Sequence, residues 1–138
     1  MAEALILDSE AVNALAHATE RAVLAERARA ILQVAHERRA LVRVPTPVLA
    51  EVCRGPRFDA AVERLLNDRG IRVCVLTQSI AQRAGGLLAK AKLTSAHAVD
   101  AFVVATALDF DTAVIATGDP GDIRRLASAH RQVKVFAM

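Results

Sequence analysis

Short apolar runs alternate with longer helical segments along the sequence, and this alternation constrains the fold more than any other feature. The run at residues 4–7 (Ala-Leu-Ile-Leu) is apolar throughout, which is typical of a strand buried on both faces of a sheet. Strands that alternate with helices pair in parallel, and the helices then cover both faces. The fold class is therefore α/β with a mostly parallel sheet. The predicted strands are residues 4–7, 41–44, 71–76, 112–116 and 133–136.

Hydrophobic periodicity and capping signals place the helices between these strands. Thr46 is a predicted N-cap, with Pro47 at the first helical position. Ser79 and Gln82 have the spacing of a capping box and predict the start of another helix. Helix 95–108 is almost wholly apolar, so we expect it to be buried. The remaining predicted helices are residues 19–39, 58–68 and 119–129.

Length and composition are those of one globular domain, predicted to span residues 1–138. The chain has 138 residues, of which 54% are hydrophobic, and this is enough to bury a substantial core. We expect no signal peptide and no membrane span, because the sequence lacks a basic amino-terminal segment and an apolar run of about 18 residues. Cys53 and Cys74 are far apart in sequence, which favours a cytoplasmic protein without a disulfide framework. The net charge of +3 permits a phosphate-bearing partner.

Two carboxylates follow the carboxyl ends of predicted strands. Asp8 comes directly after strand 4–7, and Asp119 comes shortly after strand 112–116. Each is also a suitable helix N-cap, and this structural role is sufficient to explain either residue alone. In open parallel sheets, however, ligands bind beyond the carboxyl ends of the strands, so both residues are candidates for a site.

Two further carboxylates lie within apolar helical segments. Asp100 is embedded in an otherwise apolar stretch of helix 95–108, where a carboxylate is rare unless it is paired or binds a metal. Glu51 is flanked by apolar residues and has two alternatives, a site role or a solvated position paired with Arg54 at i+3. Together with Asp8 and Asp119 they form a set of four acids.

The set points to a divalent cation, because carboxylates that meet in one crevice repel one another unless a cation neutralises them. Carboxylate oxygens are the hard ligands that Mg²⁺ and Mn²⁺ prefer. The hydroxyls of Ser9 and Thr117 adjoin the acids and could orient them, although local capping explains these residues equally well. His97 lies one helical turn before Asp100 and could contact the site, although a surface position on the helix is the preferred interpretation. The sequence lacks dinucleotide-binding, phosphate-loop and nucleophile-elbow signatures.

Four motifs in this order resemble those of PIN domains, and in particular the VapC-type toxin ribonucleases of bacterial toxin–antitoxin pairs. They are Ile-Leu-Asp-Ser at 6–9, Val-Pro-Thr-Pro-Val-Leu-Ala-Glu-Val at 44–52, Val-Asp-Ala-Phe-Val-Val-Ala-Thr-Ala at 99–107 and Thr-Gly-Asp-Pro-Gly-Asp at 117–122. The resemblance covers essentially the whole chain. It implies a three-layer α/β/α fold with a sheet of about five strands, and a cytoplasmic ribonuclease.

The resemblance also implies roles for individual residues. Asp8, Asp100 and Asp119 match the acids that bind Mg²⁺ or Mn²⁺, and Glu51 matches an acid that binds the ion or orients water. Asp122 is an alternative or additional acid in the last loop. Thr117 and Ser9 support the acids, and Arg54 matches a basic residue that meets substrate phosphate or pairs with an acid. The implied partners are RNA, a small cognate antitoxin and a second copy of the chain.

Other interpretations remain open at this point. An acidic-site signalling domain would need an acceptor Asp after strand 71–76, where the sequence has none. A haloacid-type phosphatase needs Asp-x-Asp after the first strand, where this chain has Asp8-Ser9-Glu10. A non-catalytic PIN domain that only binds RNA or protein is the third alternative. The basic residues of helix 19–39 form a solvated face, although one or two of them could contact the RNA backbone; they are Arg21, Arg27, Arg29, Arg38 and Arg39.

Overall fold

The computed structural model describes residues 3–68 and 70–138, and its strands form one parallel sheet. The order in the sheet is β3-β2-β1-β4-β5, so that β1 lies at the centre. Leu5 of β1 is aligned with Val42 of β2 on one side and with Val114 of β4 on the other. The parallel α/β class predicted from the sequence is confirmed. The strands are Glu3–Leu7 (β1), Leu41–Pro45 (β2), Ile71–Cys74 (β3), Thr112–Thr117 (β4) and Val133–Ala137 (β5).

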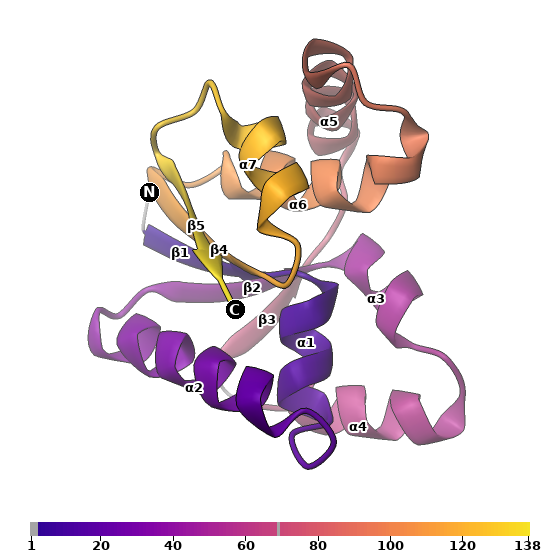
Figure 1. Ribbon diagram of the computed structural model, residues 1–138, viewed down its shortest axis with the longest axis vertical. Coiled ribbons are helices and arrows are strands. Elements are labelled where there is room, and N and C mark those ends of the chain that lie inside the picture. Colours follow the sequence, from indigo (N-terminus) through magenta and orange to yellow (C-terminus); the bar gives the residue numbers. More distant parts are fainter. Residues whose placement is uncertain (1–2, 69) are drawn as a thin grey trace.

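Helices cover both faces of this sheet (Figure 1). Helices α5, α6 and α7 lie on one face, and α1, α2 and α4 lie on the other, which gives the three layers expected from the sequence. Helix α3 follows β2 at the carboxyl edge of the sheet. The helices are Ser9–Ala16 (α1), Ala22–Glu37 (α2), Thr46–Val52 (α3), Pro56–Leu66 (α4), Gln78–Ala91 (α5), Ala98–Ala107 (α6) and Pro120–Ala127 (α7), with a short 3-10 helix at Ser95–His97.

The core is built from aliphatic side chains of the central strands and the helices that cover them. Leu5, Ile6 and Ile115 are fully buried, because β1 and β4 are covered on both faces. Only three polar side chains are buried among the described residues, namely Asp8, Thr106 and Thr117. Thr106 bonds the backbone oxygen of Phe102 one helical turn earlier, at 2.7 Å. Asp8 and Thr117 follow or end strands, and their burial needs another explanation. In the ranges 3–68 and 70–138, no helix is long and apolar enough to cross a membrane.

The largest departure from the predicted elements lies between β1 and β2. The helix predicted over residues 19–39 corresponds to α2, whereas α1, at Ser9–Ala16, was not predicted; residues 17–21 separate the two helices. Helix α2 ends at Glu37, two residues before Arg39, whose φ of 56° lies in the left-handed region and stops the helix. The other helices differ from prediction by a few residues at their ends. Strand β3 ends at Cys74 instead of residue 76.

Two predicted helix caps are wrong. Pro45, not Thr46, occupies the N-cap position of α3, and the Thr46 hydroxyl instead accepts a hydrogen bond from the backbone N–H of Leu76 at 3.1 Å. Helix α5 is capped by Thr77, whose hydroxyl accepts from the N–H of Ile80 at 3.1 Å, whereas Ser79 already lies inside the helix. Thr46 and Thr77 thus hold the loop after β3 at both of its sides. The second cap was mispredicted because Thr77 and Ser79 are both acceptable N-cap residues. Ile80 packs into the core, and the helix start that allows this packing places Thr77 at the cap.

The cap at Thr77 gives a test of this assignment. Thr77→Ala is expected to lower the free energy of unfolding by about 1 kcal/mol, because the N–H of Ile80 loses its side-chain acceptor. Ser79→Ala is the matched control, since both hydroxyls are exposed and only the first one caps. Urea denaturation of the two variants would compare them. An equal loss of stability in both would contradict the assigned cap.

Candidate active site

The candidate site lies where the direction of chain connections in the sheet reverses. From β1 the chain proceeds to β2 and β3 on one side, and it then returns to place β4 and β5 on the other side of β1. The loops after β1 and β4 therefore leave the sheet side by side and separate, which creates a crevice at their carboxyl ends. A cleft of about 390 Å³ occupies this position. Its lining residues are Asp8, Ser9, Glu10, Asn13, Glu51, Arg54, Val99, Asp100, Val103 and Asp119.

Asp8 is the deepest carboxylate of the cleft. It follows β1 and is only 5% exposed, and its side chain caps α1 by accepting from the N–H of Ala11 at 2.9 Å. Burial raises the pKa of Asp8, and hydrogen bonds from the Thr117 hydroxyl and the Ala11 N–H oppose that rise. The capping role considered from the sequence is therefore present. The same side chain also lines the cleft, so the two roles are combined in one residue.

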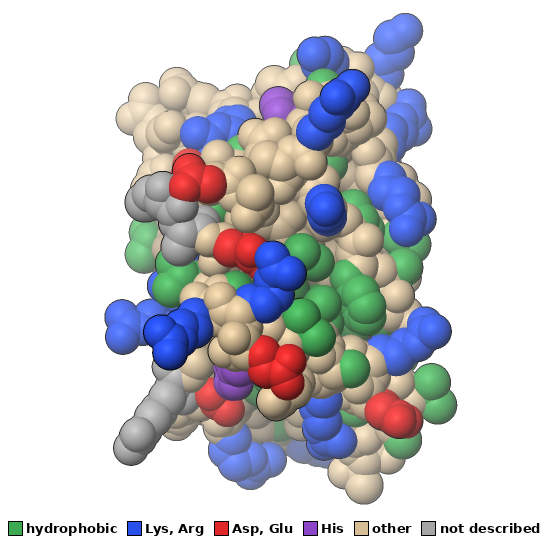
Figure 2. Space-filling model, turned by 90° about the vertical axis from the view of Figure 1, so that its left-hand side faces the viewer, with side chains coloured by type: hydrophobic (Ala, Val, Ile, Leu, Met, Phe, Trp, Pro, Cys, Tyr) green, Lys and Arg blue, Asp and Glu red, His purple; other side chains and the backbone are tan. Residues whose placement is uncertain are grey.

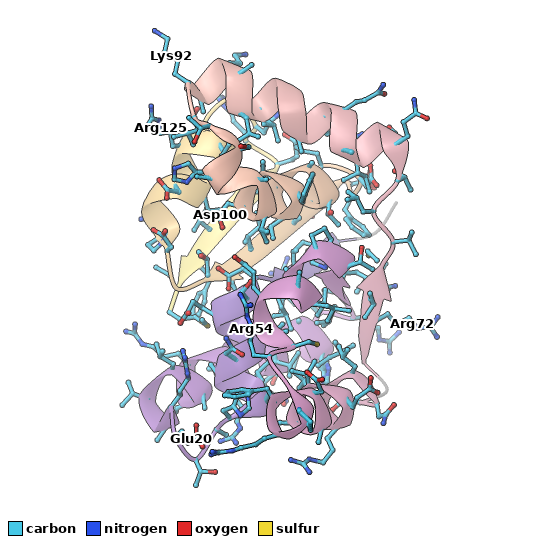
Figure 3. All side chains as sticks on the ribbon, turned by 90° about the vertical axis from the view of Figure 1, so that its right-hand side faces the viewer. Glu20, Arg54, Arg72, Lys92, Asp100 and Arg125 are labelled. Atoms are coloured by element: carbon cyan, nitrogen blue, oxygen red, sulfur yellow. The ribbon has the colours of Figure 1, made fainter. Side chains whose placement is uncertain are left out.

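Asp100 faces the same cleft from the opposite layer of the fold. It lies in the first turn of α6, and Figure 3 shows it across the cleft from Arg54. Partial burial and the negative charges of Asp8, Asp119, Asp122 and Glu51 raise the pKa of Asp100 to about 6. Asp100 therefore experiences the accumulated negative charge of the site. A protein without a cation in this cleft holds these acids together at an electrostatic cost.

Glu51 reaches the cleft from α3. The Ser9 hydroxyl donates to Glu51 Oε1, which ties the carboxylate to the start of α1. The predicted pairing of Glu51 with Arg54 differs from the structure, where Arg54 Nε donates to the backbone oxygen of Glu51 at 3.3 Å. This bond keeps the guanidinium beside the cleft without neutralising the Glu51 carboxylate. The Glu51 carboxylate is therefore oriented by the Ser9 hydroxyl at the edge of the cleft.

The loop after β4 supplies the fourth acid. The Thr117 side chain is completely buried, and its hydroxyl accepts from the N–H of Asp119 at 2.9 Å. Asp119 occupies the N-cap position of α7, but within the described ranges its carboxylate makes no capping bond, so it is available to the cleft that it lines. Gly118 passes close to α1, where a Cβ atom would lie 2.6 Å from Glu10 Cγ. Residue 118 must therefore be glycine for the loop before Asp119 to pass this close to Glu10 of α1.

Asp122 occupies a different position from Asp119. It lies in the first turn of α7, and its Oδ2 is 3.3 Å from Nδ1 of His97. It still contributes to the negative charge at Asp100. The structure thus brings Asp8, Glu51, Asp100 and Asp119 around one cleft and places Asp122 at its margin, beside the imidazole.

Sequence reasoning missed two residues of the cleft, Glu10 and Asn13, and preferred a surface position for His97. Glu10 and Asn13 line the cleft from α1, one helical turn apart, and Arg21 holds Glu10 by an ion pair of 3.0 Å. The i, i+3 spacing from Glu10 to Asn13 was the available signal, but residues 9–16 were not recognised as a helix. His97 was interpreted as a surface residue, although its spacing from Asp100 allowed contact with the site.

The donor set fits a hard divalent cation. The cleft presents carboxylates from four separate segments, and such oxygens are the ligands of Mg²⁺ and Mn²⁺. The raised pKa of Asp100 is independent support, because the charges that raise it are those that a cation would neutralise. The residues present therefore suit the metal that the sequence suggested.

A second hollow, of about 280 Å³, lies at the opposite, amino ends of the strands. Figure 2 views this face and shows apolar side chains gathered among Lys and Arg. Ile31 and Val34 of α2 and Val114 of β4 contribute the apolar wall, and the hollow contains none of the predicted site residues. We therefore place the candidate active site in the acidic cleft, which Asp8, Glu51, Asp100 and Asp119 line.

Several basic residues of α2 and its flanks bind groups of this same chain. Arg21 pairs with Glu10, and Arg38 pairs with Glu3 at 2.8 Å, which lowers the pKa of Glu3. Arg27 donates to the backbone oxygen of Met138. Neither Arg27 nor Arg38 is among the residues that line the acidic cleft.

An α/β domain with carboxylates at the switch point of a parallel sheet is now defined, and comparison with known proteins assigns its family. The PIN domain model matches residues 5–129, and the chain belongs to the PIN domain family. The resemblance seen in the sequence motifs is thereby confirmed, and the signalling-domain and phosphatase alternatives are removed. A search of curated proteins found no match.

Solved structures share this fold at low sequence identity. VapBC2 from Rickettsia felis, bound to a DNA fragment from its promoter, aligns with a TM-score of 0.65 and 10% identity over 97% of this chain and 98% of that chain. A toxin–antitoxin complex from Klebsiella pneumoniae aligns with a TM-score of 0.65 and 17% identity over 97% of this chain and 99% of that chain. At identities this low, the alignments establish the shared fold.

Proposed function

We propose that this protein is a metal-dependent endoribonuclease of the VapC type, the toxin of a type II toxin–antitoxin pair. The observation that carries the proposal is the convergence of Asp8, Glu51, Asp100 and Asp119 on one cleft of a PIN domain. The two structural neighbours described above, both toxin–antitoxin complexes, support the toxin assignment. The reaction is hydrolysis of an RNA phosphodiester bond.

Asp8, Asp100 and Asp119 would hold Mg²⁺ or Mn²⁺, and Glu51 would bind the ion or orient a water molecule. When bound, such an ion supplies positive charge to a phosphoryl oxygen and lowers the pKa of water. The chain's own contacts prepare these residues. The Ala11 N–H fixes one oxygen of Asp8, and the Ser9 hydroxyl fixes Glu51. These fixed positions reduce the reorganisation required when substrate binds.

Thr117 and Arg54 support the acids in different ways. The buried Thr117 hydroxyl orders the loop that carries Asp119 and also bonds Asp8, so it couples two of the four acids. Arg54 lies beside the cleft with an exposed side chain and is suited to contact a substrate phosphate, because a guanidinium binds phosphate oxygens in pairs. Contacts of this kind hold RNA without reading its bases.

The proposed partners follow from the same assignment. They are an RNA substrate, a small cognate antitoxin that covers the acidic cleft, and a second copy of the chain in a homodimer. We propose that residues 1–138 act as a single PIN domain in the cytoplasm.

The test is cleavage of total bacterial RNA by the purified protein with Mg²⁺, with Mn²⁺ and with a chelator. We expect discrete products that require the ion and that disappear in Asp119→Asn. Glu26→Gln is the matched control, because it removes one negative charge from the exposed side of α2. Binding of RNA without cleavage in any of these ions would identify a non-catalytic PIN domain instead, and equal cleavage by Asp119→Asn would reject the assigned site.

A further inference from the structure

His97, Asp100 and Asp122 form a cluster at the margin of the acidic cleft. One potential ligand atom from each of the three residues lies within 4.8 Å of the others. His97 ends the 3-10 helix that precedes α6, Asp100 lies in the first turn of α6, and Asp122 lies in the first turn of α7. Helices α6 and α7 pack against each other, so the cluster is held by two elements of the fold. All three side chains are partly exposed and accessible to an ion from solvent.

The spacing within the cluster is compatible with metal ligands as well as with an ion pair. His97 Nδ1 and Asp122 Oδ2 are 3.3 Å apart. A charge-assisted hydrogen bond between such groups is shorter, at about 2.7–2.9 Å. Two ligands of one tetrahedral ion, each about 2.0–2.1 Å from it, lie about 3.4 Å apart. The two atoms are therefore separated as ligands of one ion would be, and a carboxylate oxygen of Asp100 lies within 4.8 Å of a ligand atom of each.

Helix capping does not account for the imidazole. His97 occupies the N-cap position of α6, yet among the described residues its side chain makes no capping bond. The first-turn positions of Asp100 and Asp122 are favourable for any carboxylate, because the amino ends of helices carry partial positive charge. That explanation does not extend to a histidine directed at one of these carboxylates. The imidazole is thus the group that distinguishes this cluster from an ordinary group of acids.

We propose that His97, Asp100 and Asp122 form a second metal position that prefers Zn²⁺, or a similar imidazole-binding ion, over Mg²⁺. Imidazole nitrogen suits Zn²⁺ and the later transition metals, whereas Mg²⁺ requires oxygen ligands and rarely leaves its waters for nitrogen. The acidic cleft, by contrast, would hold an ion through the carboxylate oxygens of Asp8, Glu51, Asp100 and Asp119. The inference rests on the proposed function through Asp100 alone, which belongs to both positions.

The test measures binding of Zn²⁺ alone and of Mg²⁺ alone to the full chain by titration calorimetry. We expect wild type to bind Zn²⁺ more tightly than Mg²⁺, and His97→Gln to lose at least about tenfold in Zn²⁺ affinity. The Mg²⁺ affinity of His97→Gln is expected to remain that of wild type. His36→Gln is the matched control, because His36 is an exposed histidine at the end of α2. Asp122→Asn is a second variant that should lose Zn²⁺ affinity in the same way.

A second readout identifies the ligand type without reference to activity. Co²⁺ in place of Zn²⁺ is expected to give a visible absorption spectrum that changes in His97→Gln and not in His36→Gln. Unchanged Zn²⁺ affinity in both His97→Gln and Asp122→Asn would overturn the proposal, as would an equal loss of Zn²⁺ and Mg²⁺ affinity. Cleavage of RNA by wild type in Mg²⁺ is measured in parallel. Cleavage without His97-dependent Zn²⁺ binding rejects only the second position, and His97-dependent binding without cleavage rejects only the proposed ribonuclease.

Discussion

Asp100→Asn is expected to abolish RNA cleavage and, at the same time, to stabilise the metal-free protein. Cleavage should fall by at least about 100-fold, because an amide is a poor ligand for the ion that the carboxylate would hold. Stability should rise because Asp100 shares the cleft with other carboxylates, and burial and their charges raise its pKa to about 6. We therefore expect the Asp100 carboxylate to be needed for RNA cleavage and, in the metal-free protein, to lower the stability of the fold.

The gain in stability depends on pH in a defined direction. The pKa of Asp100 is higher in the folded protein than in the unfolded chain, so between about pH 4 and pH 6 the folded state binds more protons. Stability of the metal-free wild type therefore decreases as the pH rises through this window, and the loss is complete above about pH 6. A shift of this size corresponds to about 3 kcal/mol at most, and solvent screening of the half-buried group reduces it to about 1–2 kcal/mol.

Thermal unfolding with a chelator at pH 4.5 and at pH 7.5 measures this effect. We expect Asp100→Asn to have a higher Tm than wild type at the higher pH and a Tm close to wild type at the lower one. Glu26→Gln, at an exposed position of α2, should leave both values unchanged. A lower Tm for Asp100→Asn at pH 7.5 would falsify the proposed crowding of charge in the cleft.

Asp8 gives the second large effect, because its side chain serves the fold and the site together. Both Asp8→Asn and Asp8→Ala should lose RNA cleavage by at least about 100-fold. They should differ in stability, since Asn retains an oxygen that accepts from the N–H of Ala11, whereas Ala leaves that N–H and the Thr117 hydroxyl without their acceptor. We expect Asp8→Ala to be less stable than Asp8→Asn by about 2 kcal/mol.

Urea unfolding of the two variants at neutral pH, with a chelator present, would compare their stabilities. The chelator removes any contribution of bound metal, so that the difference reports the capping and buried hydrogen bonds alone. Equal stability of the Asn and Ala variants would show that Asp8 does not contribute to the cap of α1. Retained cleavage in either variant would show that the metal is held elsewhere.

The sequence predicted the sheet well, because its strands are short and its two central strands, β1 and β4, are largely apolar. Residues 4–7 and 112–116 pair in the centre of the sheet, where burial on both faces leaves a clear pattern. Helix ends were less predictable. Thr77 and Ser79 are both acceptable caps, and only the packing of Ile80 into the core determines which one is used. Helix α1 was missed, although residues 17–21, which separate it from α2, contain neither glycine nor proline to mark its end.

The acids of the cleft were predictable because of their contrast with their surroundings. Asp100 in an apolar helix and Asp8 at the end of a buried strand are unusual positions for charge. The partners of these acids were harder to predict. The bond from Ser9 to Glu51 joins α1 to α3, and the contact of His97 with Asp122 joins α6 to α7, so both depend on packing between helices. Local sequence carries no signal for either contact.

The central position of β1 determines when the acidic cleft can form during synthesis of the chain. β1 is bonded to β4, which the ribosome adds only in the last part of the chain, and Asp119 follows β4. A nascent chain that has not reached β4 lacks both the strand that completes the cleft and one of its four acids. Nearby residues can pair early, but the cleft depends on contacts between distant segments, which form late. During synthesis there is therefore an interval in which the growing chain has no assembled acidic cleft.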